Sequence, residues 1–141
     1  MILKFFNKED KSNNDSDLIN VACLMIHAAK IDENYTDKEK TIIKNTLTKL
    51  NDHNENIDQL ILEAEKKESD SNHIQDFTKN IKAMSKDNKI EIIKNIWSII
   101  LSDGNSDIFE ENLMRRLAGL LYIDSKTMGD IKSSIQNNFK Q

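Results

Sequence analysis

Proline is absent from this chain, and glycine occurs only three times. These two residues are the commonest turn formers, so a fold of many strands joined by tight turns is not expected. The single cysteine, Cys23, can form neither an intrachain disulfide nor a thiolate-rich zinc site. The composition fits a helical protein, and 141 residues suffice for one domain with its own core.

An excess of positive charge is also missing. Twenty basic residues face 24 acidic ones, which gives a net charge of −4 and argues against a nucleic-acid-binding face. The apolar start of the chain, residues 1–6, is too short for a signal peptide or a spanning helix. We therefore expect a cytoplasmic protein with a partly mobile arm at residues 1–16 and a helical domain at residues 17–141. Phe5 and Phe6 in this arm pack on the core or, alternatively, touch a protein partner or a membrane surface from outside.

Apolar residues at helical spacing recur along the whole domain, which predicts an all-α fold. Residues 18–29 and 90–101 are apolar on most sides, so we expect two enclosed central helices. The second segment is rich in β-branched isoleucine, and a buried strand is the alternative there. The polar run at residues 66–71 is interpreted as a solvated turn. Start signals precede the segments at Thr36, Asn56, Ser71 or Asn72, Ser85, Asp107 and Asp124.

The sequence repeats itself when it is shifted by 71 positions. The apolar residues of segment 21–50 then fall on those of segment 92–121. The polar turn between the helices also matches, because Asp32, Asn34, Thr36 and Glu39 fall on Asp103, Asn105, Asp107 and Glu110. This predicts two copies of one helical hairpin in a pseudo-twofold bundle, with their turns in comparable positions.

The second of these turns reads Ser-Asp-Gly-Asn-Ser-Asp-Ile-Phe-Glu over residues 102–110. It resembles the repeated Ala-Asp-Gly turn with a helix-opening Glu that marks the tellurite-resistance TerB family, which also occurs as the N-terminal domain of DjlA-type membrane co-chaperones. The first copy keeps Asp32 and Glu39 but has Ile31 and Glu33 where Ala and Gly are usual. The resemblance covers roughly residues 17–137.

This resemblance implies a bundle of about seven or eight helices in a bacterial, cytoplasmic protein that is linked to stress response and is not an enzyme. The family is also suggested to bind divalent cations through acidic residues. Where many members have an acidic residue before each turn, this chain has His27 and Ser98. His27 could ligate a transition metal, but a lone histidine on an apolar helix is more often a hydrogen-bonded structural residue.

The acidic turns have two interpretations. As metal ligands, carboxylates could hold a hard divalent cation, and the candidates are Asp32, Glu39, Asp103, Asp107 and Glu110. The spacing does not complete an EF-hand loop, because Ile43 and Met114 occupy the twelfth positions where a bidentate Glu is needed. As structural residues, the pairs Thr36/Glu39 and Asp107/Glu110 would be capping boxes, with each cap contributing roughly 1 kcal/mol.

Other chemistry has little support in the sequence. The three glycines are isolated, the three histidines lie on different segments, and Cys23 lies within an enclosed helix. The only arginines, Arg115 and Arg116, are expected to pair with Glu111, and a phosphate site is the alternative. Two functions remain: a cation-responsive interaction module, or a structural adaptor or co-chaperone-type domain without metal that binds its protein partner through an exposed apolar surface.

Overall fold

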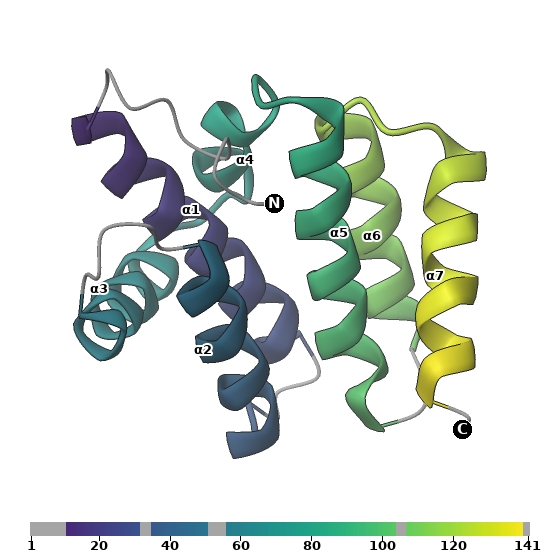
Figure 1. The fold of residues 1–141 in the computed structure, drawn as a ribbon, viewed down its shortest axis with the longest axis horizontal. Coiled ribbons are helices and arrows are strands. Elements are labelled where there is room, and N and C mark those ends of the chain that lie inside the picture. Colours follow the sequence, from purple (N-terminus) through teal and green to yellow (C-terminus); the bar gives the residue numbers. More distant parts are fainter. Residues whose placement is uncertain (1–10, 32–34, 51–55, 104–106, 140–141) are drawn as a thin grey trace.

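The computed structural model describes residues 11–31, 35–50, 56–103 and 107–139 (Figure 1). These residues form seven α-helices and one short 3₁₀-helix, and they contain no strand. The all-α, single-domain bundle predicted from the sequence is therefore confirmed, and the strand alternative for residues 90–101 is wrong. In chain order the elements are α1 (Lys11–Lys30), α2 (Asp37–Leu50), α3 (Ile57–Asp70), α4 (Gln75–Ile81), α5 (Lys86–Ile100), η2 (Leu101–Asp103), α6 (Ile108–Leu120) and α7 (Ser125–Phe139).

Helix α1 is the centre of the first half of the bundle and packs against α2, α3, α4 and α5 (Figure 1). All residues from Val21 to Ile26 are buried, as are Ala28 and Ala29. A helix with apolar residues on every face is stable only when neighbours surround it, and here four helices do so. The small alanines near its end let these neighbours approach closely.

Helix α5 is the second central helix and packs against α1, α2 and α7. Five of its isoleucines and Trp97 are buried, Ile90 is partly buried, and Lys94 lies on an exposed face. Each fully buried isoleucine contributes about 1.5–3 kcal/mol, far more than the few tenths by which a β-branched residue disfavours a helix. Burial therefore explains why this segment forms a helix.

The two predicted hairpins occupy equivalent positions in the structure. Helix α2 begins directly after Thr36, and helix α6 begins directly after Asp107, 71 positions later. The start of α2 and the short helix η2 both lie toward the lower edge of the molecule in Figure 1, where the Lys38 ammonium of α2 donates a hydrogen bond to the Ser102 carbonyl of η2 at 2.6 Å. The internal repeat thus brings the starts of α2 and α6 to one end of the bundle.

The helix starts agree with most of the predicted caps. The side chains of Asn56, Ser85 and Asp124 each accept a hydrogen bond from the backbone N–H three residues later. Helix α4 differs, because it begins at Gln75 and not directly after Ser71 or Asn72. The interpretation of residues 66–71 as a solvated turn is also wrong, since α3 continues to Asp70.

Two other expectations concern the start of the chain. Helix α1 begins at Lys11, so residues 11–16 of the predicted arm are helical. Phe5 and Phe6 lie outside the described residues. A membrane crossing needs about 20 apolar residues in one helix, and no helix in the described part of the chain has that length and hydropathy.

Candidate functional site

The first acidic turn contains a complete capping box. The carboxylate Oε1 of Glu39 accepts a hydrogen bond from the backbone N–H of Thr36 at 2.8 Å, and the Thr36 hydroxyl accepts one from the backbone N–H of Glu39 at 3.2 Å. Glu39 is 4% exposed. Asp32, the other candidate ligand of this turn, lies outside the described residues. The capping role of Glu39 is therefore confirmed.

The second turn repeats this arrangement. The carboxylate Oδ1 of Asp107 accepts from the backbone N–H of Glu110 at 2.8 Å, and Glu110 Oε1 accepts from the backbone N–H of Asp107 at 3.0 Å. Glu110 is 5% exposed. Asp103 is the last residue of η2 and directly precedes residues 104–106, which lie outside the described chain. The two capping boxes are thus equivalent in bonding and burial.

Capping and metal binding make different demands on these carboxylates. In both boxes one carboxylate oxygen is held by the backbone of its own helix start. Within the described residues, no group of three or more His, Cys, Asp or Glu side chains is arranged to hold a metal ion. The cation site predicted at Asp32, Glu39, Asp103, Asp107 and Glu110 therefore stays a prediction.

The start of α6 also presents two exposed apolar side chains. Ile108 is 68% exposed and Phe109 is 67% exposed, although both follow directly on the capping residue Asp107. Phe109 borders a cleft of about 310 Å³ between the end of α1 and the start of α6. Its other lining residues are His27, Ile31, Asn112, Leu113 and Arg116.

This cleft follows from the internal repeat. A shift of 71 positions relates Ile31 to Ser102 and Lys38 to Phe109. In one half Lys38 reaches Ser102 with a hydrogen bond, and in the other half Phe109 and Ile31 face the same cleft. Positions related by the repeat therefore hold a hydrogen-bonded polar pair at one place and two apolar residues of one cleft at the other.

His27 is a hydrogen-bonded structural residue, as expected. Its Nδ1 lies 3.1 Å from Oε2 of Glu68, whose Oε1 accepts a hydrogen bond from the Lys30 ammonium at 2.7 Å. Nearby on the same interface of α1 and α3, the Lys67 ammonium donates to the Asn20 side chain at 2.7 Å. These polar contacts fix α3 against the central helix. Sequence reasoning missed them because the partners are more than 35 positions apart.

Cys23 lies in the same interface, fully buried, with its thiol 3.5 Å from the Ala64 carbonyl. Burial raises the pKa of the Cys23 thiol to about 11. At neutral pH the residue is a thiol and not the thiolate that nucleophilic chemistry requires. It is a packing residue of the interface.

The two arginines have different surroundings. Arg115 donates to the Asn112 side chain at 3.3 Å, and Glu111, their expected partner, accepts a hydrogen bond from Lys132. Arg116 makes no hydrogen bond or ion pair with another residue in the described ranges. Its side chain lies at the border of two hollows, the cleft beside Phe109 and a smaller one beside His73.

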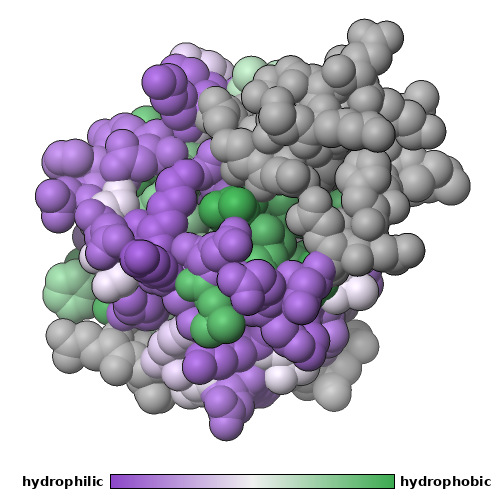
Figure 2. Space-filling view, turned by 90° about the vertical axis from the view of Figure 1, so that its left-hand side faces the viewer, coloured by the Kyte–Doolittle hydropathy of each residue, from purple (hydrophilic) through white to green (hydrophobic). Residues whose placement is uncertain are grey.

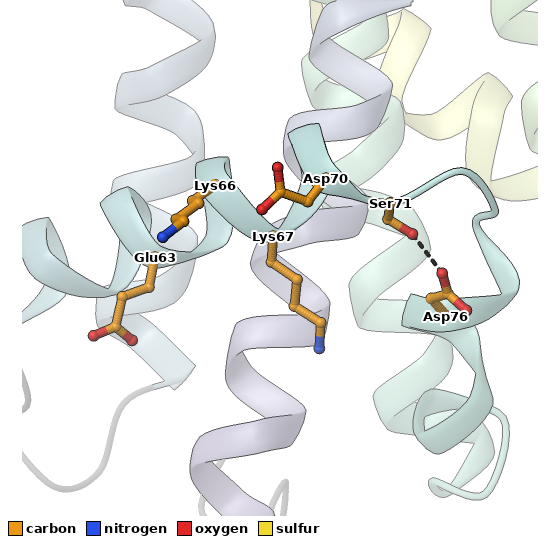
Figure 3. Close-up of a pocket in the computed structure, with 6 residues that line it drawn as sticks. All are labelled: Glu63, Lys66, Lys67, Asp70, Ser71 and Asp76. Atoms are coloured by element: carbon orange, nitrogen blue, oxygen red, sulfur yellow. Dashed lines mark hydrogen bonds between the residues drawn. The ribbon is translucent and has the colours of Figure 1, made fainter.

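A larger, charged groove of about 520 Å³ lies where α3 ends and α4 begins (Figure 3). Here the Ser71 hydroxyl donates to the Asp76 carboxylate at 2.5 Å, which fastens the connection between the two helices. The groove is lined by side chains of both signs, Glu63, Lys66, Lys67, Asp70 and Asp76, together with Ser71. Neither sign dominates, so this groove offers no clear preference for a charged ligand.

The family model described as "Tellurite resistance protein TerB" matches residues 18–133, which is most of the chain and contains both hairpins. No curated protein and no solved structure matches the chain.

Proposed function

The chain belongs to the TerB family of tellurite-resistance proteins, and we propose from that premise that it is a non-enzymatic interaction module in the bacterial stress response. The observation that supports this proposal is the exposed pair Ile108 and Phe109 beside a cleft at one end of the bundle. Large apolar side chains that remain two-thirds exposed next to a concave surface are typical of a protein-binding site. The proposed compartment is the cytoplasm.

The proposed partner is a protein segment that inserts an apolar side chain into this cleft. Ile31, Phe109 and Leu113 give the cleft an apolar wall. By contrast, the side of the molecule that carries α3 is mainly hydrophilic, with small separate hydrophobic patches (Figure 2). An aromatic residue at the centre of such a contact typically provides 2 kcal/mol or more of the binding free energy.

The experiment replaces Phe109 by serine in a bacterium whose own copy of the gene has been deleted. Two properties are measured: the tellurite tolerance that the plasmid-borne gene restores, and the protein that is cross-linked to the chain and identified by mass spectrometry. We expect Phe109→Ser to abolish both, because the partner loses roughly 2 kcal/mol of affinity, about thirtyfold. The thermal midpoint should stay unchanged, since Phe109 lies mostly in solvent.

The matched control is Leu62→Ser, which removes an equally exposed apolar side chain from α3. It should preserve both the tolerance and the cross-linked partner. If Phe109→Ser behaves like Leu62→Ser and like the unmodified chain, the α6 surface is not the binding site. Phe5→Ser with Phe6→Ser then tests the other predicted contact, the N-terminal arm.

A second candidate function is the reversible binding of a divalent cation at the acidic turns. The observation that favours it is the position of the two equivalent capping boxes at the same end of the bundle, where Lys38 links the first box to η2. A cation there would bind between the two halves and could change the shape of the adjoining cleft. The structural adaptor or co-chaperone-type domain without metal is the alternative to this candidate.

Glutamine variants separate the two roles of the acidic turns. Glutamine at the third helical position still accepts the hydrogen bond of a capping box, but it lacks the charge that a hard cation requires. We expect Glu39→Gln with Glu110→Gln and Asp103→Asn to keep the thermal midpoint and to weaken cation binding at least about tenfold. Calorimetric titration with calcium, magnesium, manganese and zinc measures this. No binding by the unmodified chain, or equal binding by the variant, would favour the metal-free adaptor.

A further inference from the structure

We propose that Arg116, together with His27 and His73, forms a binding site for an oxyanion group, and this proposal does not depend on the interaction role. The three side chains line one hollow of about 100 Å³. They come from three places in the chain: α1, the connection between α3 and α4, and α6. The hollow has the volume of about three water molecules, which is the size of a small oxyanion.

The charge at this hollow differs from that of the whole molecule. The chain carries a net charge of −4, yet Arg116 has no carboxylate partner within the described ranges. A guanidinium without a partner beside a hollow is suited to a planar or tetrahedral anion, because its N–H groups form a fork that binds two oxygens at once.

Two carboxylates that contact lining residues of the hollow are already engaged. Glu68 accepts from Lys30 and contacts His27, so its charge is compensated by its own neighbours. Asp76 accepts from the Ser71 hydroxyl. Both acidic groups thus have partners of their own, and Arg116 is the one lysine or arginine among the residues that line the hollow.

Further hydrogen-bond donors surround the guanidinium. Nδ1 of His27 faces the Glu68 carboxylate and donates to it, so Nε2 is the ring nitrogen left for a ligand; it is an acceptor in the neutral ring and a donor only in the imidazolium. The side chains of Asn72 and His73 line the same hollow. The hollow thus combines one fixed positive charge with polar side chains, of which the Asn72 amide can donate a hydrogen bond to an oxyanion.

The neighbouring cleft indicates what the anion could be attached to. Arg116 and His27 line both hollows, and the larger one adds the apolar wall of Ile31 and Phe109. An oxyanion bound at Arg116 could therefore be free, or it could carry a small apolar group that lies against Phe109. The free oxyanion and the oxyanion attached to an apolar group would make the same contacts with Arg116.

The experiment titrates the purified chain with inorganic phosphate and with phenyl phosphate at constant ionic strength. Backbone and side-chain amide signals in NMR spectra report saturable binding. Replacement of the guanidinium in Arg116→Ala should weaken the binding of both anions at least about tenfold, because one charge-assisted pair of hydrogen bonds is lost. The matched control is Arg115→Ala, which removes the adjacent arginine that lines neither hollow and should leave the binding unchanged.

The two anions distinguish the sources. If phenyl phosphate binds more tightly and Phe109→Ser removes the difference, the site takes an organic oxyanion that extends into the cleft. If the two anions bind equally and both depend on Arg116, the site takes a free oxyanion. No saturable binding by the unmodified chain, or equal losses in Arg115→Ala and Arg116→Ala, would overturn the proposal.

Discussion

At the scale of single residues, Tyr122 has the most unusual backbone conformation of the described chain. Its φ of 59° lies in the left-handed region, where glycine is favoured. It follows the end of α6 in a Schellman motif: the backbone N–H of Ile123 bonds to the Ala118 carbonyl at 2.9 Å, and that of Tyr122 to the Gly119 carbonyl at 3.4 Å. The tyrosine ring is 74% exposed, and the Lys89 ammonium lies 5.7 Å from its centre.

The strain at this position can be measured with two variants. Tyr122→Ala removes the ring and keeps a side chain in the left-handed conformation, whereas Tyr122→Gly removes both the ring and the strain. We expect the glycine variant to exceed the alanine variant in free energy of unfolding by about 1 kcal/mol. Urea denaturation followed by circular dichroism gives this difference. Equal stability of the two variants would show that the left-handed conformation costs nothing here.

Residue-scale features could be predicted from the sequence where their signal is local. The prediction of the capping boxes Thr36/Glu39 and Asp107/Glu110 is confirmed, because the residues that bond are only three positions apart in the sequence. The grouping of His27, His73 and Arg116 could not be predicted, since these residues come from segments more than 40 positions apart. Only the packing of α1, α4 and α6 brings them to one hollow.

At the scale of elements, two boundaries differ from the prediction, the end of α3 and the start of α4. The sequence of residues 66–71 is charged and polar, which is typical of a turn, but Lys67 and Glu68 bond to Asn20 and His27 of α1. These tertiary contacts extend α3 by more than a turn. Helix α4 begins late because Ser71 bonds to the side chain of Asp76 and to the carbonyl of His73 across the connection. The contacts of Lys67 and Glu68 are long-range and leave no periodic signal in a sequence, whereas those of Ser71 are local and hold the connection between α3 and α4.

The central helices were easier to predict because burial on all sides requires apolar residues on all sides. In α1 and α5 this pattern continues over about three turns. The repeat of 71 positions added independent information, because the hydrophobic pattern and the capped turn agreed between the copies. What it could not reveal is which helices surround each central helix: α1 packs against α2, α3, α4 and α5, whereas α5 packs against α1, α2 and α7.

At the scale of the whole molecule, the contacts of α1 and α2 with α5 join the two halves into one core. All the buried hydrophobic residues form a single cluster that includes residues of both hairpins, from Leu18 to Ile131. A shared core of this kind makes unfolding cooperative, so a change in one hairpin should destabilise the other by the same amount. The single tryptophan, Trp97, lies in α5, a helix of the second hairpin.

The variant Thr36→Ala tests this cooperativity from the first half. It removes the hydroxyl that caps α2 and should lower the free energy of unfolding by about 1 kcal/mol. We expect Trp97 fluorescence and far-UV circular dichroism to give the same decrease in the free energy of unfolding. Circular dichroism follows all the helices, whereas Trp97 lies in the hairpin that does not contain Thr36. The matched control is Thr48→Ala, an exposed threonine of the same helix whose hydroxyl bonds to the Lys44 carbonyl; it should change the stability by less than about 0.5 kcal/mol. The opposite result is also clear. If Thr36→Ala shifts the unfolding midpoint seen by circular dichroism but not the midpoint seen by Trp97 fluorescence, the two hairpins unfold separately.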